Sequence, residues 1–293
     1  MKIMYRTLVI VFVMMAATAM KGDKPAYRFF DAKGKKTDYD QLLKEAQKAD
    51  IVLFGELHNN PICHWLQLEL TRDLFAAKGK NLVLGAEMLE TDNQLILSEY
   101  VGGTIRQRNF EAEAKLWPNY KTDYKPLVEF ARDSSLQFIA TNVPRRYAAM
   151  VNAGGFEALN KLSDEAKTLI GPLPIAFDPN IPQYVKMAAM MGGAMPAHAS
   201  DNNTVKAQAL KDATMAFFIL QNFEKGNVFL HFHGTFHSDR FEGIMWYLKQ
   251  SDPTLKIVTI GSIEIDDPAK LPEEHTGLAD FILVIPKTMT KTH

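Results

Sequence analysis

Apolar runs separated by stretches of helical spacing set the pattern of this chain. Several consecutive apolar, often β-branched positions predict a strand, and six such runs occur, at 50–55, 81–89, 136–144, 227–234, 256–265 and 279–286. Between most of these runs the apolar residues recur every three or four positions, which predicts helices at 39–49, 63–79, 123–135 and 239–250. Strand alternating with helix predicts an α/β fold with a parallel-rich central sheet flanked by helices.

One long segment interrupts this alternation. Residues 145–225 show no convincing strand, and helical periodicity is clear at 154–171 and again at 203–226. The stretch 179–203 between these two is rich in Met, Pro and Gly. We therefore expect an inserted small all-helical subdomain at about 145–225 that covers the strand ends, and not an independent domain.

The amino terminus carries an export pattern. Lys2 and Arg6 precede the apolar run 7–20, and polar residues follow it. This layout predicts a secretory signal peptide at 1–20, because the run is too short for a comfortable membrane span. An uncleaved amino-terminal anchor is the alternative.

Composition narrows the class of protein further. The chain has 47% hydrophobic and 23% charged residues, which is typical of a globular domain at 21–293. With 33 basic and 34 acidic residues, the formal net charge of -1 gives no field that would attract nucleic acid. Cys63 is the only cysteine, so we expect no internal disulfide and no lipid-accepting cysteine. The mature domain is therefore expected to be soluble and exported, in the periplasm or cell envelope.

Polar residues gather where four of the predicted strands end. Glu56 and His58 leave the first strand, Glu87 lies at the end of the second, and Asn142 lies at the end of the third. The fourth strand ends in three histidines, which are His231, His233 and His237. Because ligands of open α/β sheets lie beyond the carboxyl ends of the strands, we expect these side chains to form one site.

Three kinds of site fit these side chains. A metal site would combine histidines with a carboxylate, and the two-residue period of a strand puts His231 and His233 on one face. An acid/base site would need Glu56 or Glu87 to be partly desolvated, so that its pKa rises toward neutrality. A cofactor pocket would let His and Tyr contact a group such as haem.

Some polar residues have a simpler expected role. A buried core position is as plausible for His231 as a ligand role, and His64 is expected on a helix surface. Asp212 lies among apolar residues of a long predicted helix, where an unpaired carboxylate is costly. We expect Asp212 to face the strand ends and to hold Arg145, Arg146 or a histidine.

Five segments together resemble the ChaN-like haem-binding family, which belongs to the wider erythromycin esterase/Tiki/ChaN-like superfamily. In chain order they are LFGELHNNP, LGAEM, WPNYKTDYKPLVEFARDSSLQFIATNVPRR, AQALKDATMA and HFHGTFHSDRFEGIMWYL. The resemblance runs over about 28–286, which is nearly the whole mature chain. The joint occurrence of the five segments is specific, whereas a single Gly-x-x-His is not.

The resemblance implies more than spacing can show. ChaN-like proteins are exported, often lipid-anchored proteins of haem uptake, and they hold haem through a tyrosinate at a dimer interface. For this chain that implies haem between the strand ends and the helical insert, a homodimer, and an outer-membrane haem receptor system as a partner. A hard phenolate suits ferric iron. The implied cofactor-binding candidates are Tyr120, Tyr124, Tyr184, His58, His237 and Arg145, with Tyr147 as a further tyrosine.

Tiki-type relatives imply an alternative function. They are metal-dependent peptidases whose Gly-x-x-His pair and glutamate lie in the active site. The corresponding metal-dependent hydrolase, a peptidase or esterase, would use Glu56, His58, Glu87 and His237 as catalytic residues. Its divalent metal ion would be held by members of the set His58, His233, His237, Glu56 and Glu87.

Overall fold

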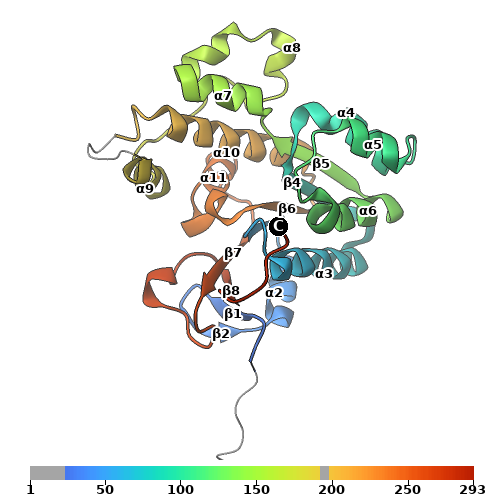
Figure 1. Ribbon diagram of the computed structural model, residues 1–293, viewed down its shortest axis with the longest axis vertical. Coiled ribbons are helices and arrows are strands. Elements are labelled where there is room, and N and C mark those ends of the chain that lie inside the picture. The colour runs from blue at the N-terminus through green and yellow to red at the C-terminus, as the bar shows by residue number, and fades with distance from the viewer. Residues whose placement is uncertain (1–23, 192–197) are drawn as a thin grey trace, which may run out of the picture.

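The computed structural model describes residues 24–191 and 198–293, and it contains an eight-stranded sheet with helices on both faces (Figure 1). The order of the strands across the sheet is β2-β1-β8-β7-β3-β6-β4-β5. The strands are β1 (Arg28–Asp31), β2 (Lys36–Thr37), β3 (Ile51–Glu56), β4 (Leu82–Glu90), β5 (Gln137–Asn142), β6 (Val228–Gly234), β7 (Ile257–Ile265) and β8 (Phe281–Pro286). The predicted signal peptide at 1–20 lies outside the described residues.

All pairings among β3 to β8 are parallel, so the predicted parallel-rich α/β fold is confirmed. Each of the six predicted apolar runs is one of these strands. The two short strands β1 and β2 were not predicted, and they pair antiparallel at one edge, β1 against β8 and β2 against β1.

Helices cover both faces of the sheet. They are α2 (Tyr39–Ala46), α3 (Pro61–Lys78), α4 (Gln94–Val101), α5 (Gln107–Glu113), α6 (Lys125–Asp133), α7 (Arg145–Gly154), α8 (Asp164–Lys167), α9 (Pro182–Met191), α10 (Asn203–Asn222) and α11 (Ile244–Ser251). A π-helical turn, Tyr120–Tyr124, precedes α6. Among the helices of the described residues, none is long and apolar enough to cross a membrane.

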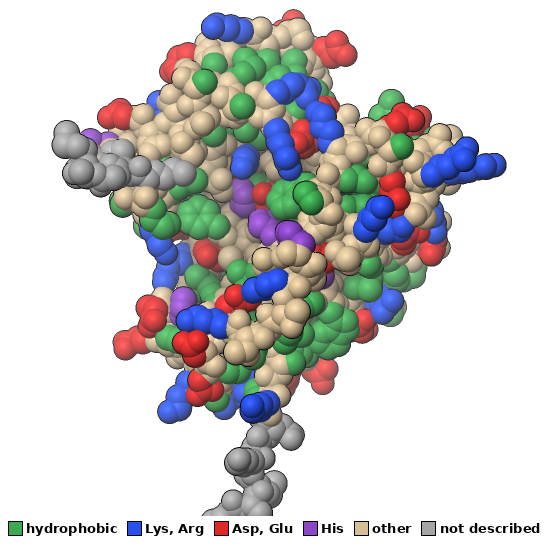
Figure 2. Space-filling view, viewed as in Figure 1, with side chains coloured by type: hydrophobic (Ala, Val, Ile, Leu, Met, Phe, Trp, Pro, Cys, Tyr) green, Lys and Arg blue, Asp and Glu red, His purple; other side chains and the backbone are tan. Residues whose placement is uncertain are grey.

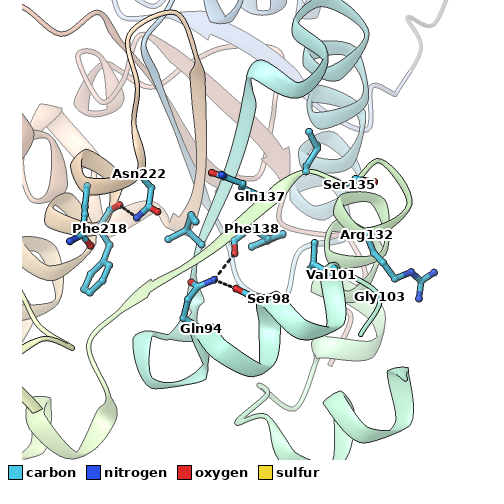
Figure 3. Close-up of a pocket in the computed structure, with 14 residues that line it drawn as sticks. Gln94, Ser98, Val101, Gly103, Arg132, Ser135, Gln137, Phe138, Phe218 and Asn222 are labelled. Atoms are coloured by element: carbon cyan, nitrogen blue, oxygen red, sulfur yellow. Dashed lines mark hydrogen bonds between the residues drawn. The ribbon is translucent and has the colours of Figure 1, made fainter. Parts of the chain in front are cut away.

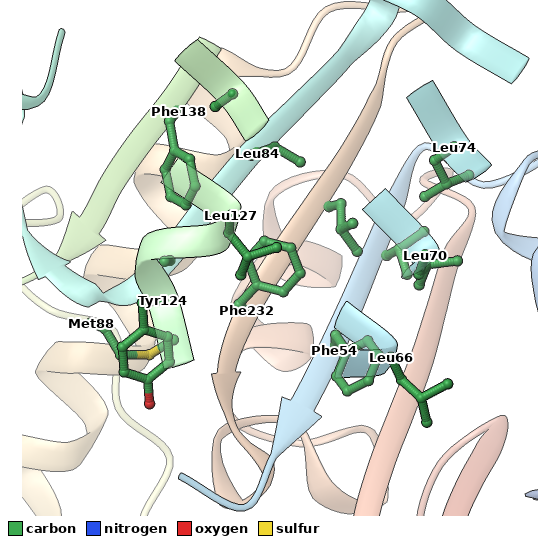
Figure 4. Packing of buried hydrophobic residues seen from close by; sticks show 14 of the residues in the cluster. Phe54, Leu66, Leu70, Leu74, Leu84, Met88, Tyr124, Leu127, Phe138 and Phe232 are labelled. Atoms are coloured by element: carbon green, nitrogen blue, oxygen red, sulfur yellow. The ribbon is translucent and has the colours of Figure 1, made fainter. Parts of the chain in front are cut away.

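Alternate residues of the buried strands enter two hydrophobic clusters. Val52 and Phe54 of β3 pack on the face covered by α3 and α6, where Figure 4 shows Leu66, Leu70 and Leu127 against the sheet. The neighbouring positions of β3 pack instead with residues of α7, α10 and α11 on the opposite face. Burial on both faces explains why the strands read as continuous apolar runs and not as an alternating pattern.

Between β5 and β6 the described residues form the helices α7 to α10, joined by turns and loops, and Figure 1 shows this segment as the upper part of the molecule. The Asn202 side chain caps α10 by accepting hydrogen bonds from the backbone N–H groups of Thr204 and Val205. Part of the Met-rich stretch predicted here, residues 192–197, lies outside the described residues.

The predicted helix at 239–250 begins later than expected. Arg240 and Phe241 have φ values of 58° and 64°, and α11 begins only at Ile244, after Gly243 with φ 53°. Left-handed backbone cannot continue an α-helix. The helical spacing was therefore correct only for the second half of this range.

The outer edge of β5 borders a cavity of about 650 Å³ remote from the polar strand ends (Figure 3). The side-chain amide of Gln94 covers this edge as a neighbouring strand would. It donates to the carbonyl oxygen of Phe138 at 3.1 Å and accepts from the backbone N–H of Ala140 at 2.6 Å. Gln94 thereby satisfies backbone groups that an edge strand leaves unpaired.

Replacing Gln94 by Ala should lower the free energy of unfolding by about 1–3 kcal/mol, because it leaves a largely buried donor and acceptor without partners. Urea unfolding of the variant measures this change. Gln107→Ala is the matched control, since Gln107 is exposed and, among the described residues, its amide hydrogen-bonds only the Glu111 side chain, at 2.9 Å. Equal unfolding midpoints for the two variants would contradict the role assigned to Gln94.

Candidate functional site

A cavity of about 870 Å³ lies at the carboxyl ends of the central strands (Figure 2). Its lining includes the strand-end residues Glu56, His58, Glu87, Asn142, Gly234 and His237. Residues from other elements complete the lining, among them Trp117, Arg145, Lys211 and Lys291. In Figure 2 histidine side chains lie in the middle of this face, with basic side chains nearby. The structure thus brings together five of the polar residues that the sequence placed at strand ends.

The two Gly-x-x-His segments, residues 55–58 and 234–237, interlock at the centre of the site. Glu56 pairs with Gly234 in the register of β3 and β6. A Cβ atom on Gly55 would lie 2.8 Å from the Cα of Thr235, and one on Gly234 would lie 2.7 Å from Nε2 of His58. Each glycine therefore makes room for the residues that follow the other strand. This close approach explains why each strand has a glycine at or next to its last position.

Glu56 holds the imidazole of His58. Oε1 of the Glu56 carboxylate lies 3.0 Å from Nδ1 of His58 and accepts a hydrogen bond of 2.7 Å from the hydroxyl of Tyr124, while Oε2 accepts one of 2.6 Å from Gln67. Burial disfavours the charged imidazole, but the hydrogen bond to Glu56 and the charge of Glu87 outweigh it and raise the pKa of His58. The His58 side chain is 41% exposed, whereas Glu56 is buried.

His237 lies between two buried carboxylates. Its Nε2 is 3.1 Å from Oε1 of Glu87 and its Nδ1 is 2.5 Å from Oδ1 of Asp212. Burial opposes the imidazolium, but these two carboxylates outweigh it and raise the pKa of His237 to about 10. Asp212 also accepts a hydrogen bond of 2.8 Å from the hydroxyl of Tyr184. The prediction that Asp212 holds a histidine is confirmed.

Burial also opposes ionisation of Glu87. The charge and the hydrogen bond of His237 outweigh this effect and hold the pKa of Glu87 well below its usual range. The backbone N–H of Gly234 adds a hydrogen bond of 2.8 Å to the same carboxylate. Glu87 and His237 therefore form an ion pair at neutral pH, and Glu87 does not have the raised pKa expected of a general acid.

The candidate tyrosines lie away from the cavity surface. Tyr120, Tyr124 and Tyr184 are buried, and none of the three lines the cavity. Burial raises the pKa of each hydroxyl, so a phenolate is disfavoured where they stand. Tyr147 is also buried, and its hydroxyl accepts a hydrogen bond of 3.2 Å from Arg146.

Two of the strand-end histidines are core residues. His231 lies with its Nε2 2.7 Å from the Thr141 hydroxyl, and its Nδ1 lies 3.0 Å from Nδ1 of His233. Nε2 of His233 is 2.8 Å from the hydroxyl of Ser238. Burial lowers the pKa of His231 to about 3 and that of His233 well below its ordinary value, so both are neutral. Both share one face as predicted, but neither lines the cavity.

The expectation that His64 lies on a helix surface is wrong. His64 is 7% exposed and its Nε2 donates to the carbonyl oxygen of His58 at 3.1 Å, within reach of the buried Asp123. Asn119 donates to the same carbonyl oxygen at 2.9 Å. The register of α3 turns His64 inward, where it supports the backbone that carries His58.

The two candidate arginines differ in their surroundings. Arg146 pairs with Asp92 and does not line the cavity. Arg145 does line it, with a side chain that is 73% exposed, a guanidinium 5.8 Å from the ring centre of Trp117, and Nε 3.3 Å from Glu90. Of the two, Arg145 is therefore the one that a ligand in the cavity can reach.

Sequence reasoning missed several residues of the lining. Trp117 packs edge-on against the His58 ring, with centroids 5.0 Å apart. Lys211 lines the cavity from α10, and Lys291 lines it from the carboxyl-terminal residues. The backbone N–H of Thr292 in this terminal segment donates a hydrogen bond of 3.0 Å to the carbonyl oxygen of Asn59. Lys211 is next to Asp212 on a long helix that the sequence predicts, so its position near the strand ends could have been inferred. The polar stretch 287–293 has no periodicity that would indicate it.

The arrangement is poorly suited to a divalent metal. Within 24–191 and 198–293, no group of three or more His, Cys, Asp or Glu side chains converges in a way that could hold a metal ion. The carboxylates of Glu56 and Glu87 are each engaged by an imidazole. What the cavity offers instead is an oriented, accessible imidazole at His58, the aromatic ring of Trp117 and a set of basic side chains.

The chain is similar to known proteins in both sequence and structure. The family described as haem-binding uptake, Tiki superfamily, ChaN matches residues 42–248, which is more than half of the chain. A comparison with curated proteins finds no match.

Among solved structures, the chain resembles ChaN of Campylobacter jejuni, which is described as binding haem cofacially. The TM-score is 0.66 at 18% sequence identity, over 88% of this chain and 96% of that one. An erythromycin esterase in its open conformation has a TM-score of 0.48 at 13% identity, over 89% and 83%. A Bacillus cereus protein has a TM-score of 0.46 at 14% identity, over 84% and 90%.

At these identities the structural likeness to ChaN of Campylobacter jejuni shows a shared fold, while the sequence match over 42–248 shows the family. The chain therefore belongs to the ChaN family of haem-binding uptake proteins, within the Tiki superfamily.

Proposed function

We propose that this protein binds haem in the cavity between the strand ends and the helical segment, and that it serves haem or iron uptake. Family membership supports haem as the ligand. The observation that carries the placement is the cavity itself, about 870 Å³ in volume, with Trp117, the accessible His58 and basic side chains in its lining. Ligand pockets of drug-sized molecules span roughly 300–1,000 Å³.

The residues present fit a haem group. Oδ1 of Asn142 is buried in the cavity lining and has no hydrogen-bond partner among the described residues, so a ligand or a water bound with it could donate to this atom. Bound haem would supply a ferric iron that can accept a nitrogen or oxygen ligand from the protein. The exposed guanidinium of Arg145 is suited to a haem carboxylate.

His58 is the residue best placed to ligate the iron. Its Nδ1 is held by Glu56, while its Nε2 makes no hydrogen bond within the described part of the chain. A carboxylate on one imidazole nitrogen orients the ring and raises the basicity of the other nitrogen. The tyrosines implied by the resemblance would first have to leave their buried positions, which is why we place His58 ahead of Tyr120, Tyr124 and Tyr184.

We also propose that the protein is exported, with residues 1–20 as its signal peptide, and acts in the periplasm or cell envelope. Cofacial haem binding in the Campylobacter relative supports a homodimer in which the haem groups of two copies face each other. An outer-membrane haem receptor system would then be the source of the cargo.

Titrating residues 21–293 with ferric haem tests this proposal, with absorbance reporting binding and size exclusion reporting dimer formation. The His58→Ala variant should bind haem more than about 100-fold more weakly, because loss of a ligand costs more than the roughly 10–100-fold lost with an outer partner. His275→Ala is the control, since His275 lies in a short turn, Glu273–His275, outside the cavity lining.

Two results would contradict the proposal. The first is the absence of saturable haem binding by the wild type. The second is an unchanged absorbance spectrum in His58→Ala together with its loss in a Phe variant of Tyr120, Tyr124 or Tyr184, which would move the iron ligand to a tyrosine.

A further inference from the structure

Basic side chains from separate elements converge on the cavity. Lys211 comes from α10, in the helical segment, and Lys291 comes from the carboxyl-terminal residues that lie beyond the family match at 42–248. Both lysines line the cavity together with Arg145. The sequence alone does not indicate that Lys211 and Lys291 line the same cavity, because they are 80 positions apart (291 minus 211).

No carboxylate among the described residues pairs with Lys211. Within the described residues no carboxylate oxygen lies within 4.0 Å of its ammonium, and the neighbouring Asp212 points instead to His237 and Tyr184. Lys211 is only partly exposed. A partly buried ammonium beside a cavity and without a carboxylate partner is suited to an anionic group of a ligand.

Within the part of the chain that the structure describes, Lys291 pairs with one carboxylate, and that carboxylate is shared. Its ammonium contacts the carboxylate of Glu264, which also accepts a hydrogen bond of 2.7 Å from the Asn60 side chain. The side chains of Lys291 and Glu264 are 34% and 23% exposed. Lys291 can therefore keep this contact and direct its remaining N–H donors toward a ligand, since an ammonium has three.

The carboxylates of the cavity lining already have hydrogen-bond partners among the described residues. Glu56 is engaged by His58, Tyr124 and Gln67, and Glu87 is engaged by His237 and the Gly234 amide. An incoming carboxylate therefore meets the ammonium of Lys211 and the remaining N–H donors of Lys291, while the carboxylates that would repel it are engaged by their own partners.

We propose that Lys211 and Lys291 bind the carboxylate groups of the cavity's ligand and thereby select for a ligand that carries them. This inference rests on the proposed haem binding, for which the carboxylates are the two propionates. It assigns ligand recognition to two residues, one of them outside the part of the chain that matches the family.

Absorbance titrations with two probes, ferric haem and ferric haem dimethyl ester, test this inference. The ester keeps the iron and the ring but has no carboxylate charge. Wild type should bind haem at least about tenfold more tightly than the ester, because a charge-assisted hydrogen bond contributes about that factor. Lys211→Met and Lys291→Met should each weaken haem binding about tenfold and leave binding of the ester unchanged.

Lys206→Met is the matched control. Lys206 is on the same helix as Lys211, but it lies beside Gly155 and outside the cavity lining, so haem affinity should stay at the wild-type value. Thermal unfolding of each variant shows that it is folded, and Lys211→Glu should bind haem more weakly still than Lys211→Met. Raising the ionic strength should reduce the difference between haem and the ester.

The inference is overturned if the wild type binds haem and its ester equally, or if both Met variants bind haem as tightly as the wild type does. In either case haem binding itself would stand. If neither probe saturates the wild type, the proposed function fails, and this inference fails with it.

Discussion

Replacing Asp212 by Ala should lower the free energy of unfolding by about 2–6 kcal/mol, because it leaves the buried Nδ1–H of His237 and the buried hydroxyl of Tyr184 without their partner, at about 1–3 kcal/mol for each group. Asp212 is fully buried and lies 2.5 Å from His237, so its loss leaves the imidazolium with Glu87 alone. Urea unfolding at neutral pH measures the change. Asp212→Asn keeps the shape and a hydrogen-bonding oxygen, so it should be less damaging than Asp212→Ala.

Asp164→Ala provides the control for this experiment. Asp164 is fully exposed and, among the described residues, pairs only with Lys167 at 3.2 Å, so its replacement should leave the stability nearly unchanged. If Asp212→Ala were as stable as Asp164→Ala, the contacts of Asp212 within the buried triad of Glu87, His237 and Asp212 would contribute nothing to the stability of the fold.

The same triad should give the stability a dependence on pH. The pKa of His237 rises from an ordinary 6.5 to about 10 in the folded chain. A group whose pKa is raised by folding contributes stability that is fully present below the lower value and is lost as the pH rises through the higher one. Wild type should therefore lose stability between pH 6.5 and 10, and Asp212→Ala should show a smaller loss over this window.

Replacing Gly243 by Ala should destabilise the fold by about 2–6 kcal/mol, which combines backbone strain of about 1–3 with overpacking of about 1–3. Gly243 has φ 53° and ψ -121°, and a Cβ atom there would lie 2.3 Å from the carbonyl oxygen of His237. Because that oxygen belongs to the backbone, it cannot move without shifting the His237 segment. Chemical unfolding measures the loss.

The chain supplies a closely matched control. Gly79 has φ 56° and ψ -130°, but a Cβ atom there would meet nothing within 4 Å. Gly79→Ala should therefore show the cost of the backbone conformation alone. The difference between the two variants isolates the collision with His237, and equal losses would mean that the segment shifts at little cost.

The fold could be predicted from the sequence because its strands are buried on both faces. Runs such as 50–55 and 227–234 are apolar throughout, and the intervening helices keep their spacing. β1 and β2 could not be predicted in the same way, since they are only four and two residues long and lie at the edge. α11 begins later than predicted because Arg240 and Phe241 have a left-handed backbone conformation, which hydrophobic spacing does not indicate.

The candidate site was predictable in its centre and not at its border. The rule that ligands lie at the carboxyl ends of strands was enough to select Glu56, His58, Glu87 and His237. The sequence does not show whether a side chain at the end of a strand or helix points into the cavity or into the core. That is why His233 and Tyr124 were candidates although neither lines the cavity, and why Lys291 was missed although it does.

The interlocked glycines have a consequence for the order of folding. β6 lies between β3 and β4 in the sheet, yet it is made of residues about 140 positions later in the chain than β4 (228 minus 90). β3 and β4 therefore stay apart until residues 228–234 insert between them. Contacts of such long sequence separation form slowly, because the loop must first be closed. A nascent chain that ends before Gly234 lacks the residue that pairs with Glu56 and the backbone N–H that hydrogen-bonds Glu87, so ligand binding should be acquired in the last stage of folding.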